Sequence, residues 1–132
     1  MEADRREAPV RARLAGAVVD LVVVLLFVGI GRHTHDHGLA PAGLASTAWP
    51  FLVGLAVGWG ALLVARRDPT TVRSGVVVCG ATVALGMALR VVAGQGTAFA
   101  FVLVALGFLG AIMVGWRAAL AVVARRRGGP VR

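Results

Sequence analysis

The residues best suited to chemistry lie in one short stretch, GRHTHDHG (residues 31–38), in which histidines occupy alternate positions. In an extended segment, His33, His35 and His37 would point to one face, whereas in a helical turn only the first and third would. Zn²⁺ takes three or four ligands from histidine, cysteine or carboxylate side chains, so this set could hold zinc with Asp36 as a further ligand. The flanking glycines favour a solvated polar loop instead, and we expect no cofactor, with zinc as the alternative.

A second candidate is Asp20, an acid within a long apolar segment. A carboxylate at the centre of a membrane helix costs roughly 2.5–3.5 kcal/mol on insertion scales, so it should face the interior of a bundle. Its height differs from that of Arg90 by about 11–12 Å at 1.5 Å per residue, which is too far for a direct ion pair. Trp59 or Thr82, at matching height, could hydrogen-bond the acid. The alternative role for Asp20 is to carry a proton or bind a substrate.

Further polar residues should lie together just outside the membrane, where Arg90 could pair with Asp36. The alternative for Arg90 is that its side chain extends to the lipid headgroups. We expect any site to lie among five residues, called the polar cluster below: Arg32, His35, Asp36, Arg90 and Gln95. The sequence contains no Ser-His-Asp or Cys-His arrangement, and we therefore do not expect an enzyme.

Four apolar segments must position these residues. The chain has 132 residues, of which 58% are hydrophobic, against about 45–50% in a typical soluble domain. A helix needs about 20 residues to cross the roughly 30 Å hydrocarbon core, and in lipid its backbone must bond to itself. The sequence therefore predicts an all-α, integral membrane four-helix bundle. Its helices are expected at residues 14–31, 48–65, 75–93 and 97–116.

The positive charges predict the orientation of this bundle. The net charge is +8, and twelve arginines fall in the N-terminal tail (1–13), in the second connection or after residue 116. Only Arg32 and Arg90 fall on the other side. Since cytoplasmic segments carry the excess of basic residues, we expect both termini in the cytoplasm and the protein in the plasma membrane. The basic segment 118–132 should begin as a helical continuation. Nucleic acid is not an expected partner, because long apolar runs separate the arginines.

Small residues recur at intervals of four and should mark helix contacts. We expect them to pack within the bundle, or against a second copy or another membrane protein in the bilayer. They are Gly54 and Gly58 in the second helix, Gly80, Ala84 and Ala88 in the third, and Gly107, Ala111 and Gly115 in the fourth.

Several short motifs carry a family resemblance. They are Asp20, Arg32 with His35, TAWPF (47–51), Arg90, GQGTAFAF (94–101) and GWR (115–117). Over about residues 14–117 the chain resembles the small four-helix bacterial membrane proteins grouped as domain of unknown function 3054. The resemblance implies an integral membrane protein without an assigned activity. It includes neither His33 nor His37, which counts against a three-histidine site as a shared function.

We therefore expect a non-enzymatic membrane protein that acts by packing or by binding a partner. One alternative is a small proton-coupled transporter that works as a dimer, with Asp20 as its membrane acid. Another is an outward-facing metal-binding protein that uses His33, His35 and His37.

Overall fold

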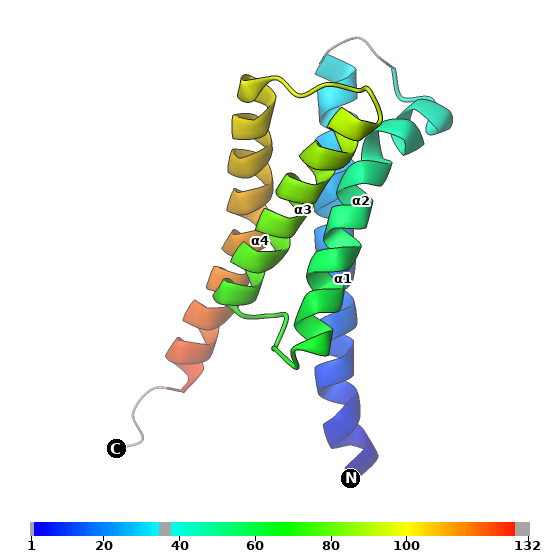
Figure 1. Cartoon of the computed structure of the whole chain (residues 1–132). Helices are drawn as coiled ribbons and strands as arrows, with labels where there is room; N and C mark the ends of the chain where they lie inside the picture. Colours follow the sequence, from blue (N-terminus) through cyan, green and yellow to red (C-terminus); the bar gives the residue numbers. More distant parts are fainter. Residues whose placement is uncertain (1, 35–37, 129–132) are drawn as a thin grey trace.

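The structure is a computed structural model that describes the backbone of residues 2–34 and 38–128 and the side chains of 9–33 and 38–128. The described residues form four α-helices and no strand (Figure 1). Each helix is long and apolar enough to cross a membrane, which confirms the predicted all-α membrane bundle. The helices are α1 (Glu2–Thr34), α2 (Pro41–Val64), α3 (Val72–Val92) and α4 (Phe99–Arg127).

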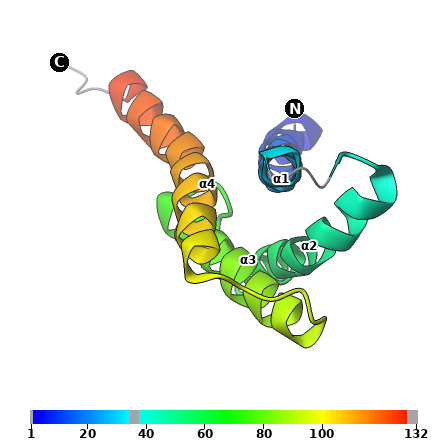
Figure 2. The ribbon, with the colours of Figure 1, turned by 90° about the horizontal axis from the view of Figure 1, so that it is seen from above.

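The two chain termini lie at the same end of the bundle, together with the α2–α3 connection (Figure 1). We call this end the terminal end, and the opposite one, which holds the α1–α2 and α3–α4 connections, the far end. The contact between α2 and α3 is the most extensive, and α3 also packs on α4. Helix α1 contacts α2 and, to the smallest extent, α4 (Figure 2).

The helices extend beyond the predicted apolar segments. Helix α4 continues to Arg127, and α2 begins at Pro41 rather than at residue 48. A proline suits the first turn of a helix, where its missing N–H is not needed. Pro50, which the expected helix 48–65 would place in a first turn, therefore lies inside α2. The early turns of α2 lean away from the bundle in Figure 1, and an interior proline is a usual cause of such a bend.

Close packing of α2 on α3 depends on glycine. A Cβ added to Gly54 would lie 2.8 Å from the carbonyl oxygen of Ala81 and 2.9 Å from Cα of Thr82. Gly58 likewise faces Val78 and Ala81. These short approaches are how small residues bring membrane helices together. The second helix therefore uses its glycines within the bundle.

The small residues of α3 and α4 behave differently. Gly80, Gly107 and Gly115 have no described atom within 4 Å of an added Cβ, and Ala84, Ala88 and Ala111 are exposed. These faces do not pack within the chain, so the expectation that they pack inside the bundle is wrong for α3 and α4.

Aromatic rings join α1 to its neighbours in the half of the bundle nearer the far end. The ring centroid of Phe27 lies 5.7 Å from that of Phe51, 5.6 Å from that of Phe101 and 5.8 Å from that of Phe108. Separations in this range are those of favourable aromatic pairs. One ring of α1 thus contacts both α2 and α4.

Candidate functional site

Asp20 is fully buried near the middle of the α1 span, eleven residues after Pro9 and thirteen before His33. It forms a two-bond ion pair with Arg117 of α4. Nη2 of Arg117 donates to Oδ2 at 2.7 Å, and Nη1 donates to Oδ1 at 3.1 Å. Bidentate pairing of this kind is among the strongest polar interactions in proteins.

Two tryptophans complete the surroundings of the Asp20 carboxylate. Trp59, one of the two residues expected to bond it, donates its indole N–H to Oδ2 at 3.0 Å, and Trp116 donates to Oδ1 at 2.9 Å. Thr82, the other expected partner, instead donates to the carbonyl of Val78. All four hydrogen bonds to Asp20 are donated to it, which suits an ionised carboxylate, since that group only accepts.

The α2–α3 turn fixes the remaining side of Arg117. Nε donates to the carbonyl of Pro69 at 2.8 Å, and Nη1 also donates to the carbonyl of Met113 at 2.9 Å. Within the turn, Oδ1 of Asp68 accepts bonds from the backbone N–H and the hydroxyl of Thr70. These two bonds hold the pKa of the Asp68 carboxyl below its usual value, because they stabilise the charged form. In the described part of the chain, no buried side-chain nitrogen or oxygen lacks a partner.

The far end gathers three members of the polar cluster, Arg32, Arg90 and Gln95, around a common region. Its other two members, His35 and Asp36, lie outside the described residues, as does His37. His33 is exposed in the last turn of α1. Groups of three potential metal ligands are absent from the described residues, but the zinc hypothesis needs His35 and His37 and stays a prediction.

Gln95 is held by a hydrogen bond to a backbone carbonyl that Pro50 leaves without its helical partner. A proline has no N–H, so the carbonyl four residues earlier, that of Ser46, receives no bond from position 50. The side-chain N–H of Gln95 donates to this carbonyl at 3.0 Å. The neighbours Gly94 and Gly96 have φ of +73° and +75°, which glycine adopts without strain. This connection therefore places the amide of Gln95 against the bend of α2.

Gln95 in turn orients Arg90 at the end of α3. Oε1 of Gln95 accepts a bond from Nη1 of Arg90 at 3.1 Å, and the carbonyl of Gly96 accepts one from Nε at 3.2 Å. The guanidinium carbon lies 5.0 Å from the ring centroid of Phe101, a cation–π distance. A carbonyl, an amide and an aromatic face therefore hold Arg90 in place.

Arg32 lies across from this group, at the end of α1. It donates from Nη1 to Oγ1 of Thr47 at 2.7 Å and from Nε to the carbonyl of Gly38 at 3.0 Å. Thr47 donates its own proton to the carbonyl of Gly43. Arg32 thereby connects the far ends of α1 and α2.

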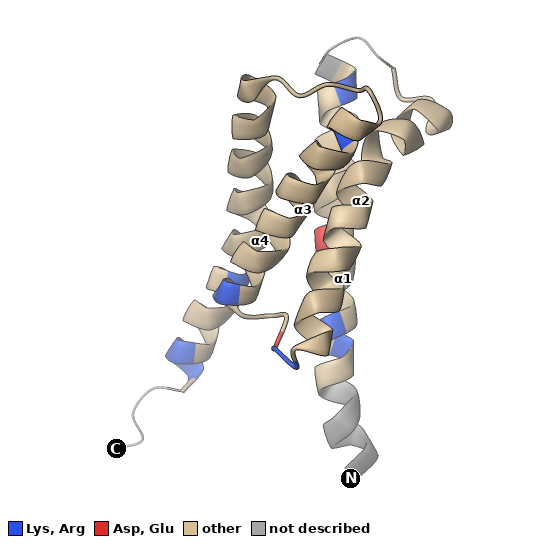
Figure 3. Cartoon of the chain, in the orientation of Figure 1, with Lys and Arg blue, Asp and Glu red and all other residues tan. Residues whose placement is uncertain are grey.

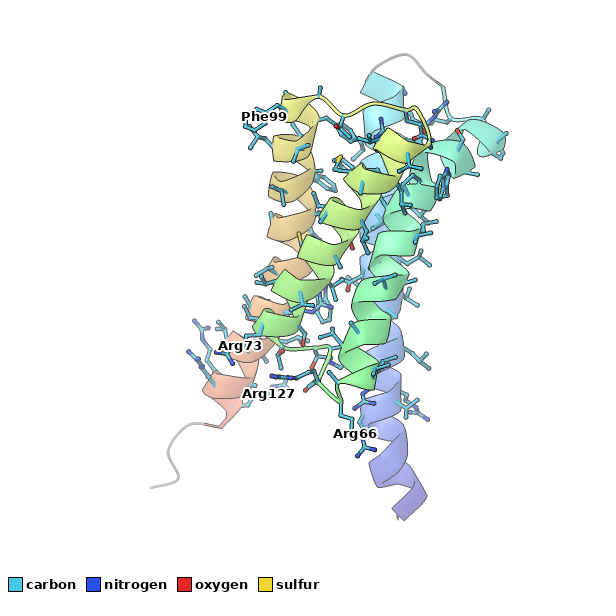
Figure 4. The ribbon with its side chains drawn as sticks, viewed as in Figure 1. Arg66, Arg73, Phe99 and Arg127 are labelled. Atoms are coloured by element: carbon cyan, nitrogen blue, oxygen red, sulfur yellow. The ribbon has the colours of Figure 1, made fainter. Side chains whose placement is uncertain are left out.

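Two adjoining cavities open among these residues. The first has a volume of about 380 Å³, and Arg32 and Thr47 are among its lining residues. The second has a volume of about 680 Å³ and lies between α1 and α4, with Val104 and Phe108 in its wall. Figure 4 shows the side chains there, with Phe99 labelled at the far end of α4. Residues that line both cavities are Phe27, Gly31, Arg90, Gln95 and Phe101.

The sequence model of one family, described as "Protein of unknown function (DUF3054)", matches residues 17–120. The chain belongs to this family. No curated protein and no solved structure matches the chain. The match confirms the resemblance seen in the sequence and, with the four apolar helices, identifies a multi-pass integral membrane protein.

The matched range includes a residue of this DUF3054 member that sequence reasoning missed, Arg117. It was counted with the basic residues of the terminal end, because the membrane-spanning part of the fourth helix was expected to end at Trp116, with a helical continuation beyond it. With the observed spans, Arg117 lies ten residues before the end of α4 and Asp20 eleven after Pro9, so the two have matching heights. Trp116 ends the predicted apolar segment, a position typical of the aromatic belt at the membrane surface. In the structure it is a hydrogen-bond partner of Asp20. Extending the membrane spans into the arginine-rich flanks would have placed Arg117 at the height of Asp20.

Proposed function

We propose that this protein is a non-enzymatic, ligand-binding protein of the plasma membrane, with its termini in the cytoplasm. The observation that carries the proposal is the cavity of about 680 Å³ between α1 and α4. Ligand sites commonly measure about 300–1,000 Å³ and combine apolar walls with a few polar groups. Here phenylalanines and Val104 form the walls, while Arg90 and Gln95 supply polar groups. The sequence led us to expect a protein that binds a partner, and we propose that this partner is a small molecule.

The polar groups around the cavities suit recognition better than catalysis. Nucleophilic catalysis requires a hydroxyl or thiol beside a general base. Three hydroxyls line the two cavities in the described structure, and those of Ser46 and Thr47 both donate to the carbonyl of Gly43. The third belongs to Thr97, and the described lining contains no histidine or carboxylate that could act as its base. Arginine and glutamine side chains, in contrast, are common groups for fixing the orientation of a bound molecule.

The distribution of charge supports the orientation. Figure 3 shows basic residues concentrated at the terminal end, and Figure 4 labels Arg66, Arg73 and Arg127 there. An excess of arginine marks the cytoplasmic side of a membrane protein. The far end, with its cavities, would then face away from the cytoplasm.

The alternative of proton-coupled transport has less support. Such a role requires Asp20 to gain and lose a proton, yet two indoles and a bidentate arginine donate to its oxygens. The outward-facing small residues of α3 and α4 fit contact with a second copy in the bilayer, which is compatible with ligand binding by each chain.

Native mass spectrometry of the protein extracted in a mild detergent tests the proposal. We expect one copurifying small molecule per chain, and we expect Gly31→Leu to remove it, because Gly31 lines both cavities and has room for a side chain. Gly29→Leu is the matched control, since Gly29 also has open space but lines neither cavity. Equal adducts in both variants, or none in the wild type, would contradict ligand binding at this place.

A further inference from the structure

We propose that the ligand is an acidic amphiphile, an anionic lipid of the surrounding leaflet whose head pairs with Arg90 and whose chain lies between α1 and α4. This inference rests on the proposed function and assigns the chemical class of its ligand. It depends on three features: the charge of the cavity lining, the fixed geometry of Arg90, and the apolar opening below it.

The charge of the lining favours an anion. The described residues that line the two cavities include Arg32 and Arg90 and no acid. The partners of Arg90 are neutral groups, and in the described structure its Nη2 atom donates to none of them. A half-buried guanidinium without a counter-charge is costly in apolar surroundings. In the same chain, the buried Arg117 forms a bidentate pair with a carboxylate. An anionic head group would give Arg90 a counter-charge in the same way.

Arg90 is fixed in position before any ligand arrives. Gln95 accepts from Nη1, the Gly96 carbonyl accepts from Nε, and Phe101 covers one face of the guanidinium. Gln95 is itself anchored to the carbonyl of Ser46. A side chain held by several neighbours loses little freedom when it binds, which strengthens association.

An apolar opening continues from Arg90 along α4. Ala100, Val104 and Phe108 line it on that helix, and the eight steps from Ala100 to Phe108 span about 12 Å at a rise of 1.5 Å each. Val104 is 60% exposed although it lines the cavity, so the cavity opens sideways toward the surroundings of the bundle. In a bilayer those surroundings are lipid chains, from which an amphiphile could enter without crossing water.

The spacing of α1 and α4 keeps this opening free. These two helices make the least contact of the packed pairs, and the Asp20–Arg117 pair joins them about midway along α1. On the far-end side of this pair, the ring of Phe27 in α1 contacts those of Phe101 and Phe108 in α4. The cavity occupies this region, with Phe27 and Ile30 of α1 on its other wall.

Equilibrium binding to the full-length protein in neutral phosphatidylcholine nanodiscs tests the ligand class with three probes: hexadecanoic acid, hexadecan-1-ol and acetate. We expect the acid to bind at least about tenfold more tightly than the alcohol, because a hydrogen bond to a charged group strengthens binding by about ten- to a hundredfold. Acetate, which lacks a chain, should bind far more weakly. Arg90→Gln should lower the affinity for the acid to that of the alcohol, and Arg90→Lys should restore part of it.

Gln95→Glu provides a second variant that retains Arg90. It places a carboxylate of the same shape beside Nη1 of Arg90, which should compete with the acid and weaken its binding. Thermal unfolding of each variant checks that the bundle is intact.

The outcomes separate this inference from the proposed function. Equal binding of acid and alcohol, unchanged by Arg90→Gln, would overturn the acidic class while a ligand still copurifies and responds to Gly31→Leu. Acetate binding as tight as that of the long acid would overturn the chain-binding part and indicate a site for small anions. A dimer that buries this opening and excludes all three probes would also overturn the inference. Absence of a copurifying molecule from the wild type, or equal amounts of it in Gly31→Leu and Gly29→Leu, would instead contradict the function itself.

Discussion

Burying the charge of Asp20 or of Arg117 alone in a membrane would cost free energy, and pairing the two charges offsets that cost. Both side chains are fully buried, and every hydrogen-bonding group around them has a partner among the described residues. Removing one member of a buried pair leaves the other charge without compensation, which costs more than the pair contributes. The pair therefore favours the one arrangement of α1 and α4 in which the two charges meet.

We expect Asp20→Asn and Arg117→Gln each to lower the free energy of unfolding by about 3–5 kcal/mol. The double variant should lose less than the sum of the two, because neither charge is then left alone. Denaturant titration in detergent micelles measures all three. Strictly additive losses would show that the two side chains do not stabilise one another.

Residue-level reasoning from the sequence located the acid but not its main partner. The need to satisfy a buried carboxylate predicted an indole from α2, and Trp59 donates to Asp20. Arg117 was missed because the end of the apolar segment was taken as the end of the membrane span, so the arginine after it was counted with the cytoplasmic charges. Long side chains allow such residues to remain helical within the membrane while their charges find partners.

At the scale of elements, the sequence predicted four helices but misplaced the start of α2. The residues from Pro41 to Thr47 are too mixed in polarity to count as an apolar span. Their helix places Pro50 in the interior, and this frees the carbonyl that Gln95 binds. The link between these two residues depends on tertiary structure, so no local pattern could have predicted it.

The contact of α2 with α3 makes a specific prediction about glycine. Gly54→Ala should lower the free energy of unfolding by about 1–3 kcal/mol, because the new methyl group would meet backbone atoms of α3. Gly60→Ala on the same helix should be neutral or stabilising by up to about 1 kcal/mol, since alanine favours helix and Gly60 has open space. Thermal or denaturant unfolding of the two variants measures the difference. Equal effects would show that α2 and α3 are not as closely packed as described.

The bundle is joined by side-chain hydrogen bonds around Asp20, and it contains two cavities nearer the far end. About midway along α1, Asp20 connects α1 to α4 and α2 through side-chain bonds. Toward the far end, aromatic rings of α1 and α4 contact each other beside a cavity. A bundle fixed in this way can admit a ligand at one end without loss of its helix arrangement. Which side of the membrane that end faces decides where a ligand comes from.

Two introduced cysteines test the orientation. Ala65 and Ala93 are matched positions, because each is exposed and directly follows a helix, at the terminal end and the far end respectively. In a Cys79→Ala background, a membrane-impermeant maleimide added to intact cells should label Ala93→Cys. It should label Ala65→Cys only after permeabilisation. The opposite pattern would place the arginine-rich end outside, against the usual charge bias. The cavity would then draw its ligand from the cytoplasmic leaflet, where acidic lipids are typically concentrated.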